Sequence, residues 1–234
     1  MYEKGIGVGE DKEAAQTLYV KAFEGFSDIF ETLDAETMNG RQDFLKSYVP
    51  YRMGKMFLYG QGTEQDYQNA FQYFSLSADL ENKYASYYLG KIRQNGWGIE
   101  KDLDEALTHY EKASGTVPYA AYEAGNIYKA RGQETQAYKC YQSAFKQFQK
   151  VNQKNPDDKL QYRIGYMLYN GMGVEKSIIK AEKMLLLSAE ANNKYAKILL
   201  AKIYIELEEP EKQITGINIL EKLSESDPDD KIYY

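Results

Sequence analysis

The chain contains one histidine and one cysteine, the residue types that most often act as bases, nucleophiles or metal ligands. A cysteine–histidine nucleophile pair would require His109 and Cys140 to meet in the fold. One residue of each type cannot build a histidine metal site or a thiolate cluster. We therefore predict no catalytic residues, no metal ligands and no cofactor, and we classify the chain as a non-enzyme.

Glycine spacing near the N-terminus suggests a second kind of chemistry, because Gly5-Ile-Gly7-Val-Gly9 is similar to a phosphate-binding loop. Such a loop follows a β-strand and opens the helix of a βαβ unit, which this sequence does not indicate. Similar glycine pairs occur at three more places, and we interpret all four as structural turns. The acidic runs 206–211 and 227–230 are interpreted as solvated loops and helix caps rather than as cation sites.

With catalysis and metal binding set aside, recognition of a partner by the protein surface is the remaining class of function, and the composition favours it. Of 234 residues, 23 are tyrosine, nine phenylalanine and one tryptophan, an excess of tyrosine that needs a reason. The net charge of −6 argues against general affinity for phosphate backbones, so nucleic acid is an unfavoured partner. Mean hydropathy is −0.65 and no apolar run reaches the roughly 20 residues of a membrane-spanning helix, so we expect a soluble chain without membrane insertion.

The residues that could bind a partner must be positioned by helices, since the sequence repeats a helical segment with a small central residue. The central residues are 36, 35, 40 and 36 residues apart: Gly54, Gly90, Gly125, Gly165 and Ala201. A glycine pair follows most copies and ends the first helix of each unit. A polar cap then opens a second helix at Asp11, Asp66, Asp102 and Ser177, and Glu105 completes a capping box with Asp102.

One copy carries a recognisable pattern: Ala85-x-x-x-Leu89-Gly90, Gly96-Trp-Gly98-Ile99, Lys101-Asp102 and Ala106-x-x-His-Tyr110-x-Lys112-Ala113. It resembles the Sel-one-like repeat, a branch of the tetratricopeptide superfamily. The copies 49–78 and 160–189 are similar, whereas 119–144 and 195–223 lack the glycine pair. The predicted fold is an all-α, right-handed α-solenoid of tandem helix-turn-helix repeats, forming one elongated curved domain, because stacked units bury faces that one unit cannot.

The predicted boundaries describe a single repeat array over residues 1–234. Residues 1–47 form a partial first repeat with an extended helix and a loop, and 229–234 start a truncated repeat. The complete repeats are 48–82, 83–117, 118–157, 158–193 and 194–228. Because both termini fall inside repeats, we expect an excerpt from a longer protein. No signal peptide is visible, and the predicted location is cytoplasmic.

A face of the first helices is the candidate site. An α-helix turns by 100° per residue. On this geometry one side of each first helix carries four positions: six, three and two residues before the central residue and one after it. This side is separate from the side that faces the core. In tetratricopeptide-like solenoids the first helices face the inner, concave surface. Tyrosines three before the glycine either contact a partner or pack between units. The predicted partner-binding residues are Arg52, Lys55, Tyr84, Tyr88, Lys91, Tyr119, Asn126, Arg163, Tyr166 and Lys202.

The leading hypothesis is a protein-interaction scaffold that binds a peptide or protein on its concave face, because tyrosine and arginine suit recognition surfaces. The resemblance also implies an alternative. Repeats of this family occur as accessory segments of larger proteins, including bacterial mobilisation and conjugation proteins, so the chain could be the docking segment of a multidomain enzyme.

Overall fold

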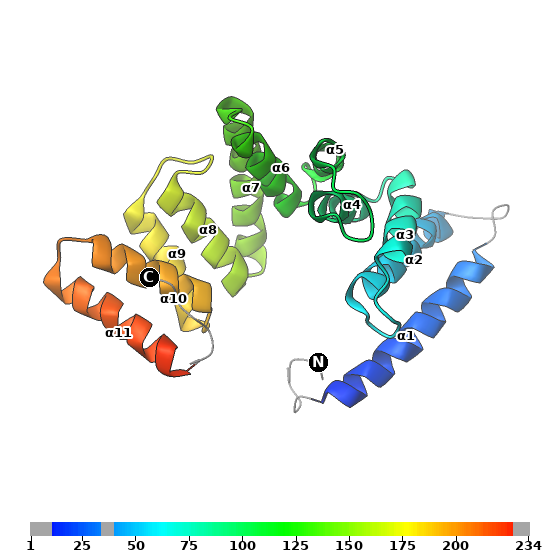
Figure 1. The fold of residues 1–234 in the computed structure, drawn as a ribbon, viewed down its shortest axis with the longest axis horizontal. Coiled ribbons are helices and arrows are strands. Elements are labelled where there is room, and N and C mark those ends of the chain that lie inside the picture. The colour runs from blue at the N-terminus through cyan, green and yellow to red at the C-terminus, as the bar shows by residue number, and fades with distance from the viewer. Residues whose placement is uncertain (1–10, 34–39, 227–234) are drawn as a thin grey trace. The chain divides into compact units, whose positions relative to one another are not determined.

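The computed structural model describes residues 11–33 and 40–226 (Figure 1). These residues form eleven α-helices and no strand, which confirms an all-α solenoid of helix pairs. The helices are α1 (Lys12–Thr32), α2 (Gly40–Tyr59), α3 (Tyr67–Asp79), α4 (Lys83–Asn95), α5 (Leu103–Ala113), α6 (Pro118–Ala130), α7 (Glu134–Lys154), α8 (Asp158–Asn170), α9 (Ile178–Glu190), α10 (Lys194–Glu206) and α11 (Pro210–Ser226).

The chain divides into two compact units, residues 1–127 (unit 1) and 128–234 (unit 2). The predicted boundaries of the single array stay a prediction. The extended helix is α1, whereas α2 already begins at Gly40, inside the segment expected to hold a loop. The Gly5–Gly9 turn and the acidic motif 227–231 lie outside the described residues.

Each glycine of a pair has its own task. Gly60, Gly96 and Gly171 end their helices with φ of 65°, 70° and 68°, the left-handed region that glycine enters without side-chain strain. The second glycine lets the turn approach the preceding second helix. A Cβ at Gly62 would lie 2.2 Å from the Tyr19 carbonyl oxygen of α1, and one at Gly173 would lie 2.1 Å from the Gln142 backbone nitrogen of α7. The pair therefore both ends a helix and docks its repeat onto the previous one.

The central glycines make room for a large buried side chain of the partner helix. A Cβ at Gly54 would lie 2.8 Å from the Phe74 ring, and one at Gly90 would lie 2.6 Å from the Tyr110 ring. Where alanine replaces this glycine, at Ala201, the small residue has moved to the other helix. Gly216 on α11 faces Ala201, and a Cβ there would lie 2.8 Å from the Ala201 carbonyl oxygen. Close helix contact is thus kept in the fifth copy.

The predicted helix caps are confirmed, with one correction. Side chains of Asp11, Asp66, Asp102 and Ser177 accept hydrogen bonds from backbone N–H groups of the following turn. Only half of the predicted capping box forms: the Glu105 N–H donates to Asp102 Oδ1 (2.9 Å), but the Glu105 side chain pairs elsewhere. The Asp102 N–H donates to the Arg93 carbonyl (2.9 Å), while the Glu105 carboxylate pairs with Arg93 Nε (2.5 Å). Because the inter-helix turn folds back on α4, Arg93 binds both the Asp102 N–H and the Glu105 carboxylate.

The glycine-pair turn is absent where the sequence departs from the repeat pattern. Three residues connect α6 to α7 and α10 to α11, whereas seven connect α4 to α5. Gly132 alone reverses the chain after α6, with φ of 71°, and the Gln133 N–H donates to the Tyr128 carbonyl (2.9 Å). This short turn is the ordinary tetratricopeptide-like connection expected there.

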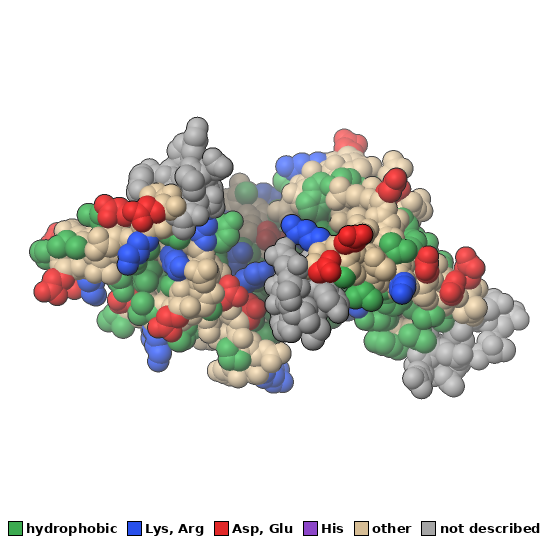
Figure 2. Space-filling view, turned by 90° about the horizontal axis from the view of Figure 1, so that it is seen from below, with side chains coloured by type: hydrophobic (Ala, Val, Ile, Leu, Met, Phe, Trp, Pro, Cys, Tyr) green, Lys and Arg blue, Asp and Glu red, His purple; other side chains and the backbone are tan. Residues whose placement is uncertain are grey.

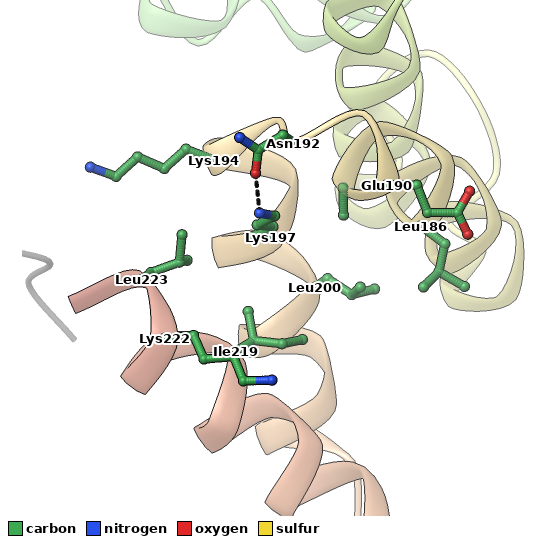
Figure 3. Close-up of a pocket in the computed structure, with 10 residues that line it drawn as sticks. Leu186, Glu190, Asn192, Lys194, Lys197, Leu200, Ile219, Lys222 and Leu223 are labelled. Atoms are coloured by element: carbon green, nitrogen blue, oxygen red, sulfur yellow. Dashed lines mark hydrogen bonds between the residues drawn. The ribbon is translucent and has the colours of Figure 1, made fainter. Parts of the chain in front are cut away.

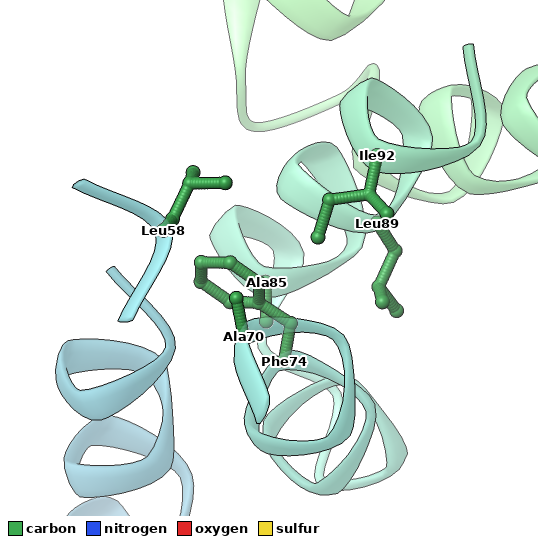
Figure 4. Close-up of a cluster of buried hydrophobic side chains, with 6 residues drawn as sticks. All are labelled: Leu58, Ala70, Phe74, Ala85, Leu89 and Ile92. Atoms are coloured by element: carbon green, nitrogen blue, oxygen red, sulfur yellow. The ribbon is translucent and has the colours of Figure 1, made fainter. Parts of the chain in front are cut away.

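The core of unit 1 runs continuously from one repeat to the next. Leu58 of α2, Phe74 of α3 and Leu89 of α4 meet in one buried cluster with Ala70, Ala85 and Ile92 (Figure 4). Phe74 and Ile92 have no exposed surface. Burying a large apolar side chain contributes about 1.5–3 kcal/mol, so the interface between repeats carries much of the stability. This rigid core positions the outer sides of α2 and α4.

Polar bonds also join the two helices of a repeat and, through a helix cap, one repeat to the next. The buried Ser77 hydroxyl donates to the Ser47 carbonyl (2.5 Å), and the equivalent Ser188 donates to the Asp158 carbonyl (2.7 Å). Asn193, which caps α10, donates from Nδ2 to the Asp158 carboxylate (2.7 Å). A cap at the start of one repeat is therefore bonded to the first helix of the preceding one.

Candidate partner-binding face

In unit 1 the candidate site is the face of α2 and α4, which we call the first-helix face. It consists of Tyr48, Tyr51, Arg52, Lys55, Tyr84, Tyr88 and Lys91. Its centre is the half-buried Tyr51 ring, whose centroid lies 6.1 Å from that of Tyr84 and 6.0 Å from that of Tyr88. Tyr51 therefore joins two repeats, which favours the packing role for tyrosines at this register. Tyr84 keeps 51% of its surface exposed and is the open tyrosine of the row.

Tyr88 is part of the core boundary as much as of the surface. Its ring stacks on Phe74 with centroids 4.9 Å apart and planes 3° from parallel. Burial, together with neighbouring tyrosines, raises the Tyr88 pKa far above its ordinary value. The hydroxyl therefore stays protonated, and Tyr88 offers a partner only the outer edge of its ring.

Two cations lie among these rings. Arg52 Nη1 donates to the Tyr48 hydroxyl (2.9 Å), and its guanidinium lies 5.3 Å from the Phe26 ring centroid. Lys55 Nζ lies 5.9 Å from the centroids of both Tyr51 and Tyr88. Burial, and secondly the charge of Arg52, lowers the Lys55 pKa. The tyrosine rings hold both cations through their electron-rich faces.

Lys91, one turn along α4 from Tyr88, lines a small pocket. Its Nζ is 5.4 Å from the centroid of Trp97, which stacks on Tyr67 (5.9 Å). The pocket, of about 320 Å³, is lined by Lys91, Gln94, Asn95, Trp97, Tyr110 and Glu123. Two of its lining residues are bonded to each other, since the Tyr110 hydroxyl donates to the Gln94 side-chain oxygen.

Two of the predicted residues, Tyr119 and Asn126, lie on α6. Asn126 Nδ2 donates to Glu123 Oε2 (2.9 Å), and Glu123 lines the pocket that contains Lys91. Tyr119 is half-buried on the same helix. Sequence analysis missed Glu123, the one acidic side chain of α6, because it occupies a position that holds arginine, tyrosine or leucine in the other copies.

Unit 2 has its own version of the face on α8 and α10. The Tyr162 ring lies 6.0 Å from Tyr195 and 6.1 Å from Tyr166, and the Arg163 guanidinium lies 5.9 Å from the Tyr162 ring. Tyr195 is 67% exposed. The tyrosine contact between repeats in unit 1 is thus repeated in unit 2.

Lys202 lies beside a carboxylate. Its Nζ lies 3.9 Å from Glu206, which also accepts a 2.6 Å hydrogen bond from the Tyr169 hydroxyl. This bond raises the Tyr169 pKa to about 12. Sequence analysis did not identify Tyr169 or Glu206, which lie at the ends of α8 and α10.

Comparison with known proteins identifies the repeat. The sequence model of the Sel1 repeat matches residues 1–25, 51–82, 83–114 and 159–193, more than half of the chain. The chain belongs to the Sel1 repeat family. The matched stretches include the glycine-pair turns, and the two copies that lack that pair, 119–144 and 195–223, are not matched. No curated protein sequence matches the chain.

Two solved bacterial structures share the Sel1 repeat fold. A Sel1 repeat protein from Oxalobacter formigenes is 20% identical with a TM-score of 0.60, covering 95% of this chain and 84% of its own. The protective antigen c5321 of uropathogenic Escherichia coli is 19% identical with a TM-score of 0.56, covering 97% of this chain. This chain spans 52% of the length of c5321. At these identities the likeness concerns the fold alone.

The residues first considered for catalysis occupy packing positions in their Sel1 repeats. His109 and Cys140 share their register with Tyr73 and Met184, and Tyr73 stacks on Phe57 at 5.4 Å. His109 belongs to unit 1 and Cys140 to unit 2, and both are half-buried. Within residues 11–33 and 40–226, no group of three His, Cys, Asp or Glu side chains could hold a metal ion.

Sequence analysis also missed two apolar grooves beside the second helices. A groove of about 670 Å³ lies between α9, α10 and α11, with Leu186, Leu200 and Ile219 facing it and Lys194, Lys197 and Lys222 around it (Figure 3). A groove of about 340 Å³ lies at the corresponding helices α1, α2 and α3 of unit 1. Their residues come from three helices each, so no local sequence pattern indicates them.

The surface drawn in Figure 2 shows basic, acidic and apolar side chains interspersed over each unit. Among the described residues, no helix combines the length and apolar character needed to cross a membrane.

Proposed function

We propose that the chain is a non-enzymatic interaction scaffold and that the first-helix face of unit 1 binds a peptide or protein partner. Sel1 repeat proteins are generally interaction scaffolds. The first helices line the inner surface of tetratricopeptide-like solenoids, which makes this face the natural place for a partner.

The observation that carries the proposal is the tyrosine row across α2 and α4. Tyr51 and Tyr88 are fixed by packing, so their ring edges form a preordered floor, while Tyr84 stands exposed beside them. Rigid aromatic side chains bind a partner at low conformational-entropy cost. The adjacent Arg52 and Lys55 add hydrogen-bond donors to that floor.

The remaining predicted residues extend the proposed surface within each unit. Tyr119 and Asn126 continue it on α6 of unit 1. In unit 2, Arg163, Tyr166 and Lys202 occupy the same registers on α8 and α10. The alternative role, as a docking segment of a larger multidomain protein, stays a prediction that uses the same surface.

Substitution of two tyrosines of equal exposure tests the proposal. Tyr84 is 51% exposed on the first-helix face, and Tyr138 is 48% exposed on the second helix α7. Proteins retained by the immobilised wild-type chain would be quantified by mass spectrometry beside Tyr84→Ala and Tyr138→Ala. We expect Tyr84→Ala to lose a retained partner that Tyr138→Ala keeps. Equal retention by all three chains would contradict the proposal.

A further inference from the structure

Charge is segregated between the two helices of each repeat in unit 1. The first-helix stretches Phe44–Tyr59 and Lys83–Asn95 contain six Lys or Arg residues and no Asp or Glu. The second helices α1, α3 and α5 contain eight acidic and three basic residues. In a chain of net charge −6, these stretches of α2 and α4 therefore form a locally basic layer, whereas the first helix α6 carries Glu123.

Within this layer, the three cations of the first-helix face, Arg52, Lys55 and Lys91, form no ion pair with a described carboxylate. In the described part of the chain, no Asp or Glu oxygen lies within 4 Å of Arg52, Lys55 or Lys91; aromatic rings surround them instead. By contrast, Lys83 pairs with Glu81 and Arg93 with Glu105. The protein thus neutralises the basic side chains at the ends of α4 and leaves those among the tyrosines available.

The placement of Arg52 and Lys55 suits short acidic side chains. Arg52 uses Nη1 for the Tyr48 hydroxyl, so its other guanidinium N–H groups can donate to a carboxylate. Lys55 is half-buried between two rings, and burial, together with the nearby charge of Arg52, lowers its pKa. A carboxylate beside it would compensate its charge in a poorly hydrated place, where charge pairs are stronger than in water.

We propose that the partner is a protein segment with acidic side chains, which contact Arg52, Lys55 and Lys91 while its apolar groups lie on the tyrosine row. This inference rests on the proposed function and specifies the partner. A nucleic acid fits less well, because the surrounding negative charge opposes a long polyanion and only three cations are available.

Peptide pools that differ only in charge test the inference. We would synthesise fluorescent pools of about 12 residues, random except for four fixed positions occupied by Glu, Gln or Lys. Binding to the whole chain would be measured by fluorescence anisotropy at low and high salt. We expect the Glu pool to bind about tenfold more tightly than the Gln pool, with the difference shrinking at high salt because screening weakens charge pairs.

Variants locate the preference on the face. Arg52→Gln/Lys55→Met removes both charges while keeping unbranched side chains, and Arg52→Gln alone is a milder version should the double variant unfold. We expect either to reduce the Glu-pool preference. Lys83→Gln, which removes a cation already paired with Glu81, is the matched control and should retain it. Far-UV circular dichroism would verify folding.

Each result bears on the inference separately from the proposed function. Equal binding of the Glu and Gln pools, with both weakened by Tyr84→Ala, would overturn the acidic partner and leave peptide binding by this face intact. If none of the pools bound to the chain, the inference of an acidic partner would also be overturned. Tighter Arg52- and Lys55-dependent binding of an oligothymidine of about 12 nucleotides than of the Glu pool would assign the face to nucleic acid instead.

Discussion

Tyr51 of α2 contacts Tyr84 of α4 across the boundary between two repeats, with ring centroids 6.1 Å apart. The same contact recurs between Tyr162 and Tyr195 at 6.0 Å. Each pair joins a half-buried ring to an exposed one. Much of the tyrosine excess thus arises from repeat architecture, while the exposed member of each pair remains available for recognition.

We expect Tyr51→Ala to lower the free energy of unfolding of unit 1 by about 2 kcal/mol, because a half-buried ring in contact with Phe74, Tyr84 and Tyr88 is lost. Tyr84→Ala should cost less than about 1 kcal/mol. Urea unfolding followed by the fluorescence of Trp97, the only tryptophan, would report on unit 1. Equal losses for both variants would contradict the division into packing and recognition tyrosines.

The two tasks of glycine make a second prediction, in unit 2. Gly132→Ala meets no atom within 4 Å, so it should cost only the left-handed backbone strain, about 1 kcal/mol. Gly173→Ala has a comparable φ of 66°, but its Cβ would meet backbone of Tyr141 and Gln142. We expect a loss of at least about 3 kcal/mol, seen as faster hydrogen exchange in α7 and α9. A Gly173→Ala loss no larger than that of Gly132→Ala would refute the docking role.

The sequence predicted these helices well because their signals are local. Polar caps such as Asp66 and the left-handed glycines such as Gly96 act within one turn of chain. The central glycines recur at a fixed spacing, since each must face a large residue of its own helix pair. Helix existence, helix ends and the repeat therefore follow from residues near one another in sequence.

The candidate site was less predictable because neighbouring repeats complete it. Helical geometry places Tyr88 in the exposed sector of α4, but Phe74 of α3 stacks on its ring. The sequence pattern assigns the Glu105 side chain to the start of its own helix, α5. In the folded protein its carboxylate instead pairs with Arg93 of α4. The unpaired state of Lys55 likewise depends on which side chains surround it in three dimensions.

Ser77 offers a third prediction, about the polar bonds that meet at the Ser47 carbonyl. Its hydroxyl donates to the Ser47 carbonyl, and Ala113 occupies the same register one repeat later. Because another copy tolerates alanine, Ser77→Ala should cost only about 1 kcal/mol, the net value of one hydrogen bond. Asn82→Ala should cost more, since it removes the α4 cap and the Asn82 bond to the same carbonyl. Urea unfolding by Trp97 fluorescence would rank them, and the reverse order would be inconsistent with this role for Asn82.

His109 gives a prediction about pH. Burial, then the charge of Lys112, lowers its pKa below the ordinary value of 6.5, and Arg93 adds to this effect while Glu105 opposes it. Below pH 6.5 the unfolded chain therefore binds more protons at this residue than the folded chain does. By linkage, the contribution of His109 to stability is lost as the pH falls below 6.5.

Replacing His109 by methionine, the residue at the same register in Met184, removes this dependence while keeping an apolar side chain of similar size. Urea unfolding by Trp97 fluorescence at about pH 7.5 and pH 5.5 would measure the loss of stability on acidification in both proteins. We expect a smaller loss for His109→Met than for the wild type. An equal loss in both would show that His109 takes up its proton as easily in the folded repeat as in the unfolded chain, which its burial beside two basic side chains argues against.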